Sequence, residues 1–198
     1  MREVELKAVV GDLASARKTL EKAGATLGYE GRLLDQRYDV ESRELAQRDE
    51  VLRVRRYERS GSTRTYLEWK GPTEMQGAYK IREEVSTLVE DFPALERILV
   101  RLGFGITMEV DREIAQYDLG GATIRFETYP RMDVLVEVEG EPETIEIAIE
   151  SLGMARGEFT VERLPTFVER FERRTGVRAA ICDRELSGDY RFRRSEPS

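Results

Sequence analysis

The chain has 198 residues, of which 40% are hydrophobic, and this length and composition suit one domain with a buried core. Its 39 acidic residues outnumber its 32 basic ones, and a net charge of −7 argues against a general nucleic-acid or anionic-membrane surface. Cys182 is the only cysteine and there is no histidine, so an intrachain disulfide is excluded and any metal must be bound by oxygen. The first residues contain neither a signal-peptide core nor a membrane-spanning stretch, and we expect a cytoplasmic protein.

Alternation of apolar and polar residues dominates the chain and predicts β-strands. In the first run, for example, Val4, Leu6 and Ala8 alternate with charged residues. Eight runs have this pattern, at residues 2–10, 26–40, 51–59, 63–70, 78–89, 104–118, 121–129 and 133–140. Short turn signals separate several neighbouring runs, which favours antiparallel pairing.

Four segments have helical spacing of their apolar residues. They run from the cap Asp12 to before Gly24, from near Pro93 to before Gly103, from Pro142 to before Gly153, and from Leu164 to about residue 174. We divide the chain into a domain over residues 1–175 and a C-terminal extension over 176–198. We expect the extension to be partly flexible, mainly in its last ten residues.

Because successive side chains of a strand point to opposite faces, the alternating charges gather on one face of the predicted sheet. That face carries Glu3, Glu5, Lys7, Arg53, Arg55, Arg64, Glu68, Lys70, Lys80, Arg82, Glu84, Arg112, Arg125, Glu127, Glu137 and Glu139. A solvated face of an open sheet would also alternate, but Arg and Glu two residues apart at both ends of the sheet favour a binding surface. Carboxylates in such pairs suit Mg²⁺ or Mn²⁺, and the neighbouring Arg and Lys suit phosphate oxygens.

Six short motifs follow one another along the predicted strands. They are Glu3-x-Glu5-x-Lys7, LLDQRYDV at 33–40, VLRVRR at 51–56, YLEWKGP at 66–72, YKIREEV at 79–85 and LVEVEG at 135–140. In this order they resemble the CYTH superfamily, the triphosphate tunnel metalloenzymes, which includes class IV adenylate cyclases and thiamine and inorganic triphosphatases. The resemblance covers about residues 1–175. It implies an α+β fold whose eight-stranded antiparallel β-barrel forms a tunnel, with a charged lumen and helices packed outside.

The resemblance also implies roles for the charged residues, by position in the motifs. The implied metal ligands are Glu3, Glu5, Glu127, Glu137 and Glu139. The implied triphosphate-binding residues are Lys7, Arg53, Arg55, Lys70, Lys80, Arg82, Arg112 and Arg125. Lys7, Glu5 and Glu84 are the implied catalytic residues, with Glu84 sharing the metal or orienting a basic neighbour. The chain departs from the family at Glu127, where Asp is usual, and at Asp111, where Lys is usual; we expect Arg112 to face the lumen in place of Asp111.

The function we expect is metal-dependent hydrolysis of an inorganic or organic triphosphate, with Mg²⁺ or Mn²⁺ as cofactor. Class IV adenylate cyclase, which converts ATP to cyclic AMP and pyrophosphate, is the alternative, because the same residues would bind the triphosphate. A third possibility is a module that binds triphosphate or polyphosphate without turnover, although pure phosphate binding would not favour a carboxylate cluster. We expect a small-molecule partner and neither nucleic acid nor membrane, in a monomer or homodimer.

Overall fold

The computed structural model describes residues 2–76 and 79–189. Within these ranges, the side chains of residues 2, 3, 76, 79 and 80 lie outside the described part.

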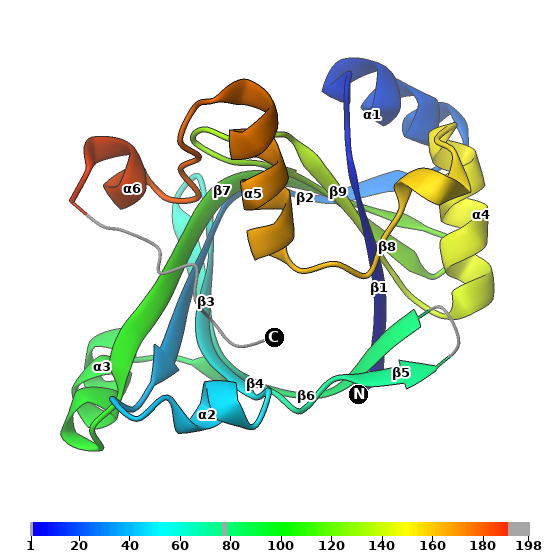
Figure 1. The fold of residues 1–198 in the computed structure, drawn as a ribbon. Helices are drawn as coiled ribbons and strands as arrows, with labels where there is room; N and C mark the ends of the chain where they lie inside the picture. Colours follow the sequence, from blue (N-terminus) through cyan, green and yellow to red (C-terminus); the bar gives the residue numbers. More distant parts are fainter. Residues whose placement is uncertain (1, 77–78, 190–198) are drawn as a thin grey trace.

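Eight antiparallel strands close into a barrel, which confirms the predicted architecture (Figure 1). They are β1 (Arg2–Val9), β2 (Thr26–Asp39), β3 (Val51–Arg59), β4 (Ser62–Lys70), β6 (Tyr79–Val89), β7 (Gly105–Leu119), β8 (Ala122–Thr128) and β9 (Leu135–Glu139). The strands follow the order β1-β9-β8-β7-β2-β3-β4-β6, and pairing of β1 with β6 closes the ring. Closure removes the two free edges that an open sheet of this length would expose.

One further strand, β5 (Glu74–Gln76), lies outside the barrel and pairs with the start of β6. The sequence analysis left residues 71–77 between two predicted strands and expected no strand there, which was wrong for residues 74–76. A three-residue strand is too short to show alternation, so periodicity could not separate it from the turn that precedes β6.

Four predicted helices are present and begin and end close to the expected residues. They are α1 (Leu13–Lys22), α3 (Phe92–Arg101), α4 (Pro142–Leu152) and α5 (Leu164–Thr175). Asp12 caps α1 by accepting a 3.1 Å hydrogen bond from the backbone N–H of Ser15, and Gly153 ends α4 in the left-handed region at φ 68°. The short elements α2 (Glu44–Gln47), η1 (Arg156–Glu158) and α6 (Asp183–Ser187) had no periodic signal and were not predicted. Among the described residues, no helix is both long and apolar enough to cross a membrane.

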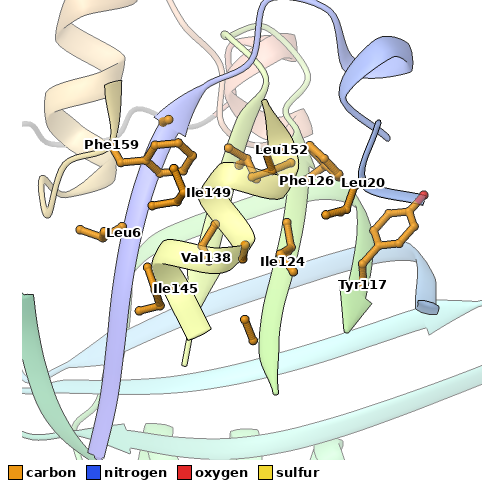
Figure 2. Close-up of a cluster of buried hydrophobic side chains, with 14 of the residues drawn as sticks. Leu6, Leu20, Tyr117, Ile124, Phe126, Val138, Ile145, Ile149, Leu152 and Phe159 are labelled. Carbon is orange, nitrogen blue, oxygen red and sulfur yellow. The ribbon is translucent and has the colours of Figure 1, made fainter. Parts of the chain in front are cut away.

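The largest core lies between the outer face of the barrel and the helices α1 and α4. Figure 2 shows Ile124 of β8 and Val138 of β9 beside α4, which carries Ile145 and Ile149. Leu6 of β1 belongs to the same buried cluster. These strand residues are the apolar partners in the alternation whose charged members face the other way. Packing of the helices on the outside therefore commits the charged face to the lumen.

Part of the C-terminal extension packs against the barrel. Ala180 and Arg131 exchange backbone hydrogen bonds of 2.8 and 3.0 Å, and the backbone N–H of Asp111 donates to the carbonyl of Ile181 at 2.8 Å. Ile181 is buried with Phe167 of α5 against strands β7 and β9. The expectation of flexibility rested mainly on the last ten residues, and residues 190–198 lie outside the described part.

The outer core provides a test of this packing within one helix. Ile149 is 3% exposed and Ile147 is 57% exposed, although both belong to α4. We expect Ile149→Ala to lower the free energy of unfolding by about 2–5 kcal/mol, because it leaves a cavity beneath the helix. Ile147→Ala is the matched control, with an expected change below about 0.5 kcal/mol. Chemical denaturation measures both, and equal losses would contradict the assigned burial.

Candidate functional site

The charged face encloses a cavity of about 530 Å³, lined mostly by charged side chains. Strands from around the whole barrel contribute to its wall, as do residues next to α2 and the first turn of α5. Figure 1 shows α5 and α2 on opposite sides of the opening that the strands enclose. The lumen is therefore a polar tunnel, and the side chains that line it decide what it can bind.

Three carboxylates meet on the wall formed by β1 and β9, and we call Glu5, Glu137 and Glu139 the acid group. The pairing of the two strands places Glu5 opposite Glu139, and Lys7 opposite Glu137. One oxygen from each carboxylate lies within 4.8 Å of the other two. Divalent cations such as Mg²⁺ and Mn²⁺ prefer oxygen ligands, and this donor set fits such an ion. The sequence analysis assigned all three residues as metal ligands, and the structure brings them together.

Two cationic side chains contact the acid group. Lys7 Nζ lies 3.0 Å from Glu5 Oε1 and 2.6 Å from Glu137 Oε2. Arg125 Nη2 contacts Glu137 Oε1 and lies 2.9 Å from Glu139 Oε1. Both cations line the cavity, so the implied triphosphate-binding residues and the acid group share one surface.

A buried carboxylate, Asp35 of β2, holds together three of the implied phosphate-binding arginines. Arg55 donates two hydrogen bonds to Asp35, from Nε at 2.7 Å and from Nη2 at 2.9 Å. Arg112 Nη1 lies 3.0 Å from the same carboxylate, and Arg53 Nη1 lies 3.5 Å from it. We call Arg53, Arg55 and Arg112 the arginine cluster. Glu68 of β4 also accepts a hydrogen bond from Arg53 Nε at 2.9 Å.

The arginine cluster keeps the buried carboxylate ionised. Burial by itself raises the pKa of Asp35, but the charges of Arg53, Arg55 and Arg112 hold this pKa well below its ordinary value. A carboxylate that stays charged can neutralise the arginines and fix their orientation.

Glu127 of β8 lies at the centre of the basic network. Its carboxylate accepts hydrogen bonds from Arg112 Nε at 2.8 Å, from Arg125 Nε at 3.4 Å and from the Tyr129 hydroxyl at 2.6 Å. Burial raises the pKa of Glu127, but Arg112 and Arg125 outweigh it and lower the pKa to about 2. The acid group comprises Glu5, Glu137 and Glu139, so the metal-binding role assigned to Glu127 stays a prediction.

Lys70, Glu84 and Arg82 lie along β4 and β6. Lys70 forms an ion pair with Glu84, so Glu84 contacts a basic neighbour as the sequence analysis considered. Arg82 Nε donates to the carbonyl of Gly71 at 2.6 Å, and its Nη2 contacts the carbonyl of Asp49. Burial lowers the pKa of Arg82, and repulsion from Arg163 adds to this effect while Asp49 opposes it.

Two assigned residues can be placed only by their backbone. Glu3 pairs with Arg82 across β1 and β6, and Lys80 pairs with Glu5 across the same two strands. The side chains of Glu3 and Lys80 lie outside the described residues, so their assigned roles stay predictions.

The expectation about positions 111 and 112 is confirmed. Arg112 lines the cavity, whereas Asp111 forms an ion pair with Arg32 and contributes no lining. Strand alternation requires this result, because neighbouring residues cannot share a face.

The sequence analysis missed many of the residues that line the cavity, among them Asp35, Arg37 and Arg163. Asp35 and Arg37 lie two residues apart within LLDQRYDV, so strict alternation along that run would have found them. Arg163 precedes α5, and its Nη2 lies 2.7 Å from Asp49 Oδ1 and 3.2 Å from Thr73 Oγ1. No local pattern marks Arg163, because tertiary packing of α5 brings it to the tunnel.

Comparison with known proteins agrees with this architecture. The sequence matches the model of the CYTH domain over residues 1–156. None of the curated proteins matches the sequence.

Several solved structures share the fold. A candidate adenylate cyclase from Vibrio parahaemolyticus is 15% identical, with a TM-score of 0.73 over 84% of this chain and 97% of that chain. The PH1819 protein from Pyrococcus horikoshii is 24% identical, with a TM-score of 0.69 over 81% and 94% of the two chains. A candidate adenylyl cyclase from Hippeastrum, described as having a dominant triphosphatase activity, is 14% identical, with a TM-score of 0.59 over 81% and 90%.

The lowered pKa of Glu127 predicts that the free energy of unfolding falls at acid pH. Its folded pKa of about 2 lies below the ordinary 4.5, so its contribution is present above pH 4.5 and is lost as the pH falls toward 2. We expect the free energy of unfolding of Glu127→Gln to fall less than that of the wild type between about pH 6 and pH 3.

Denaturation at several pH values measures this difference. Glu113→Gln is the control, because Glu113 is exposed and lies outside the cavity lining, and its variant should keep the full wild-type fall. Equal acid sensitivity of Glu127→Gln and wild type would contradict the ionised, arginine-bound state of Glu127.

Proposed function

Because the chain belongs to the CYTH domain family, we propose that it hydrolyses inorganic or organic triphosphates in its tunnel with a divalent metal ion, Mg²⁺ or Mn²⁺. The observation that supports this proposal is the continuity of the acid group with the arginine cluster. Arg125 contacts Glu137 and Glu139 on one side and Glu127 on the other, and Glu127 accepts from Arg112. A ligand that combines polyanion and metal complements such a wall.

The cationic and the acidic residues of the lumen would have different roles. The arginine cluster, with Lys7, Lys70 and Arg125, would bind phosphate oxygens and stabilise the charge that develops on them. Glu5, Glu137 and Glu139 would hold the metal, which when bound neutralises phosphate charge and lowers the pKa of an attacking water. No histidine is required, because positioning and electrostatics account for most of the catalysis of phosphoryl transfer.

The composition of the cavity wall favours recognition of the phosphate chain. Among the described lining residues, the uncharged polar side chains are Tyr38, Thr107, Tyr129 and Thr166. The hydroxyl of Tyr129 already donates to Glu127, and that of Tyr38 donates to Gln36. Few groups are therefore placed to read the edge of a nucleobase, and this favours hydrolysis over the cyclisation of ATP. The Hippeastrum protein, named for cyclase activity, is itself described as mainly a triphosphatase.

The two other functions make different products. A class IV adenylate cyclase would use the same phosphate contacts and release cyclic AMP with pyrophosphate. A binding module would bind triphosphate without any product, but such a module would not require three carboxylates at one wall of a basic lumen.

The product assay distinguishes these functions. Purified protein is incubated with tripolyphosphate, ATP or thiamine triphosphate, each with Mg²⁺ or Mn²⁺, and phosphate, pyrophosphate and cyclic AMP are resolved. We expect metal-dependent release of phosphate and no cyclic AMP. Cyclic AMP with pyrophosphate from ATP would overturn the proposal in favour of a cyclase, and tight binding without any product would favour a binding module.

Substitution of one member of the acid group tests the assignment of residues. We expect Glu137→Gln to lower turnover by about 10²-fold or more, because the site loses one of the carboxylates that would hold the metal. Glu113→Gln is the control, since Glu113 is an exposed residue of β7 outside the cavity lining. Both variants should be folded at the assay temperature, which a thermal unfolding measurement checks. Full activity of Glu137→Gln would show that the acid group is not the metal site.

A further inference from the structure

Every carboxylate of the acid group already has a cationic side chain of the protein at contact distance. Lys7 Nζ bridges Glu5 and Glu137, at 3.0 and 2.6 Å. Arg125 Nη2 bridges Glu137 and Glu139. Glu137, the most buried member, contacts both cations, with one carboxylate oxygen toward each.

These contacts conflict with metal binding at the same oxygens. A carboxylate oxygen binds Mg²⁺ at about 2.1 Å, and a divalent ion at that distance would repel an ammonium or guanidinium group held on the same carboxylates. The acid group could bind the ion strongly only if the Lys7 and Arg125 head groups moved away. Their present positions therefore oppose metal binding.

The same two side chains have another anion to bind. Lys7 and Arg125 line the cavity together with the arginine cluster, where the phosphates of a substrate would lie. Lysine has a flexible four-carbon stem, and arginine can bind two phosphate oxygens in its plane. A short movement from carboxylate to phosphate would keep both cations paired and would leave the carboxylates to the metal.

Building on the function proposed above, we propose that Lys7 and Arg125 compete with the divalent metal for the acid group, and that triphosphate relieves this competition by binding both side chains. Metal and triphosphate then bind cooperatively, because each removes the obstacle to the other. Without triphosphate, the protein binds metal weakly. The two cations thus make metal loading depend on the presence of the substrate.

A Mn²⁺ titration of the protein without triphosphate tests this competition. Free Mn²⁺ is followed by electron paramagnetic resonance for the wild type and for Lys7→Gln, which removes one competitor and keeps a polar side chain. We expect Lys7→Gln to bind Mn²⁺ more tightly by about tenfold or more, the effect of removing a like charge a few ångströms away. Arg125→Gln should change the affinity in the same direction.

A matched control separates direct competition from the general charge of the lumen. Lys70 is another lysine that lines the cavity, and it forms an ion pair with Glu84 of β6. Lys70→Gln should therefore tighten Mn²⁺ binding by less than about threefold. Equal effects of Lys7→Gln and Lys70→Gln would overturn the competition.

Glu137→Gln distinguishes failure of this inference from failure of the proposed metal site. If Glu137→Gln abolishes Mn²⁺ binding and Lys7→Gln leaves it unchanged or weaker, the metal site stands and the competition is wrong. If Glu137→Gln binds Mn²⁺ as the wild type does, the metal site and the competition both fail. Thermal unfolding provides a second measurement, in which Mn²⁺ should raise the melting temperature of Lys7→Gln more than that of the wild type.

Discussion

Burial of charge inside a closed barrel is the constraint on which the rest of this structure depends. Closure turns one face of every strand toward a lumen, and in this chain that face is charged. Removing charged groups from water costs several kcal/mol for each ion, and only pairing and hydrogen bonding within the lumen offset that cost. The contacts of Asp35 and Glu127 with the surrounding arginines follow from this requirement.

The same pairing would favour binding of the proposed triphosphate. Arginines that are fixed by carboxylates already point in set directions, so a phosphate would meet donors whose conformational freedom has been reduced. Yet each pairing also competes with the ligand. The acid group shows this most directly, because the cations that neutralise it occupy the oxygens that a metal would need. Stability and the proposed metal binding therefore depend on the same carboxylates, and in our proposal the phosphates of the substrate replace these carboxylates as partners of the cations.

Most helices pack on the outer face of the barrel and do not line the cavity. Helices α1 and α4 cover one side of the barrel, and α3 covers another with Leu99 packed near Val54. Helix α5 differs, because its first turn reaches the cavity while its buried residues pack with the C-terminal extension. Through Arg163 and Asp49, this helix is joined to the loop before β3 at the mouth of the tunnel.

The sequence by itself determined the eight barrel strands, the long helices and which face is charged, because alternation and helical spacing are local properties of the chain. Glu5, Lys7, Glu137 and Glu139 could be placed on the charged face in this way, since each lies at a charged position of a regular strand, and their roles followed from the family resemblance. Only the tertiary structure decided which charges meet. Barrel closure sets the register that joins β1 to β9, and the packing of α5 brings Arg163 to the cavity from a segment with no periodic signal. Contacts of this kind depend on residues far apart in the chain, and no local pattern records them.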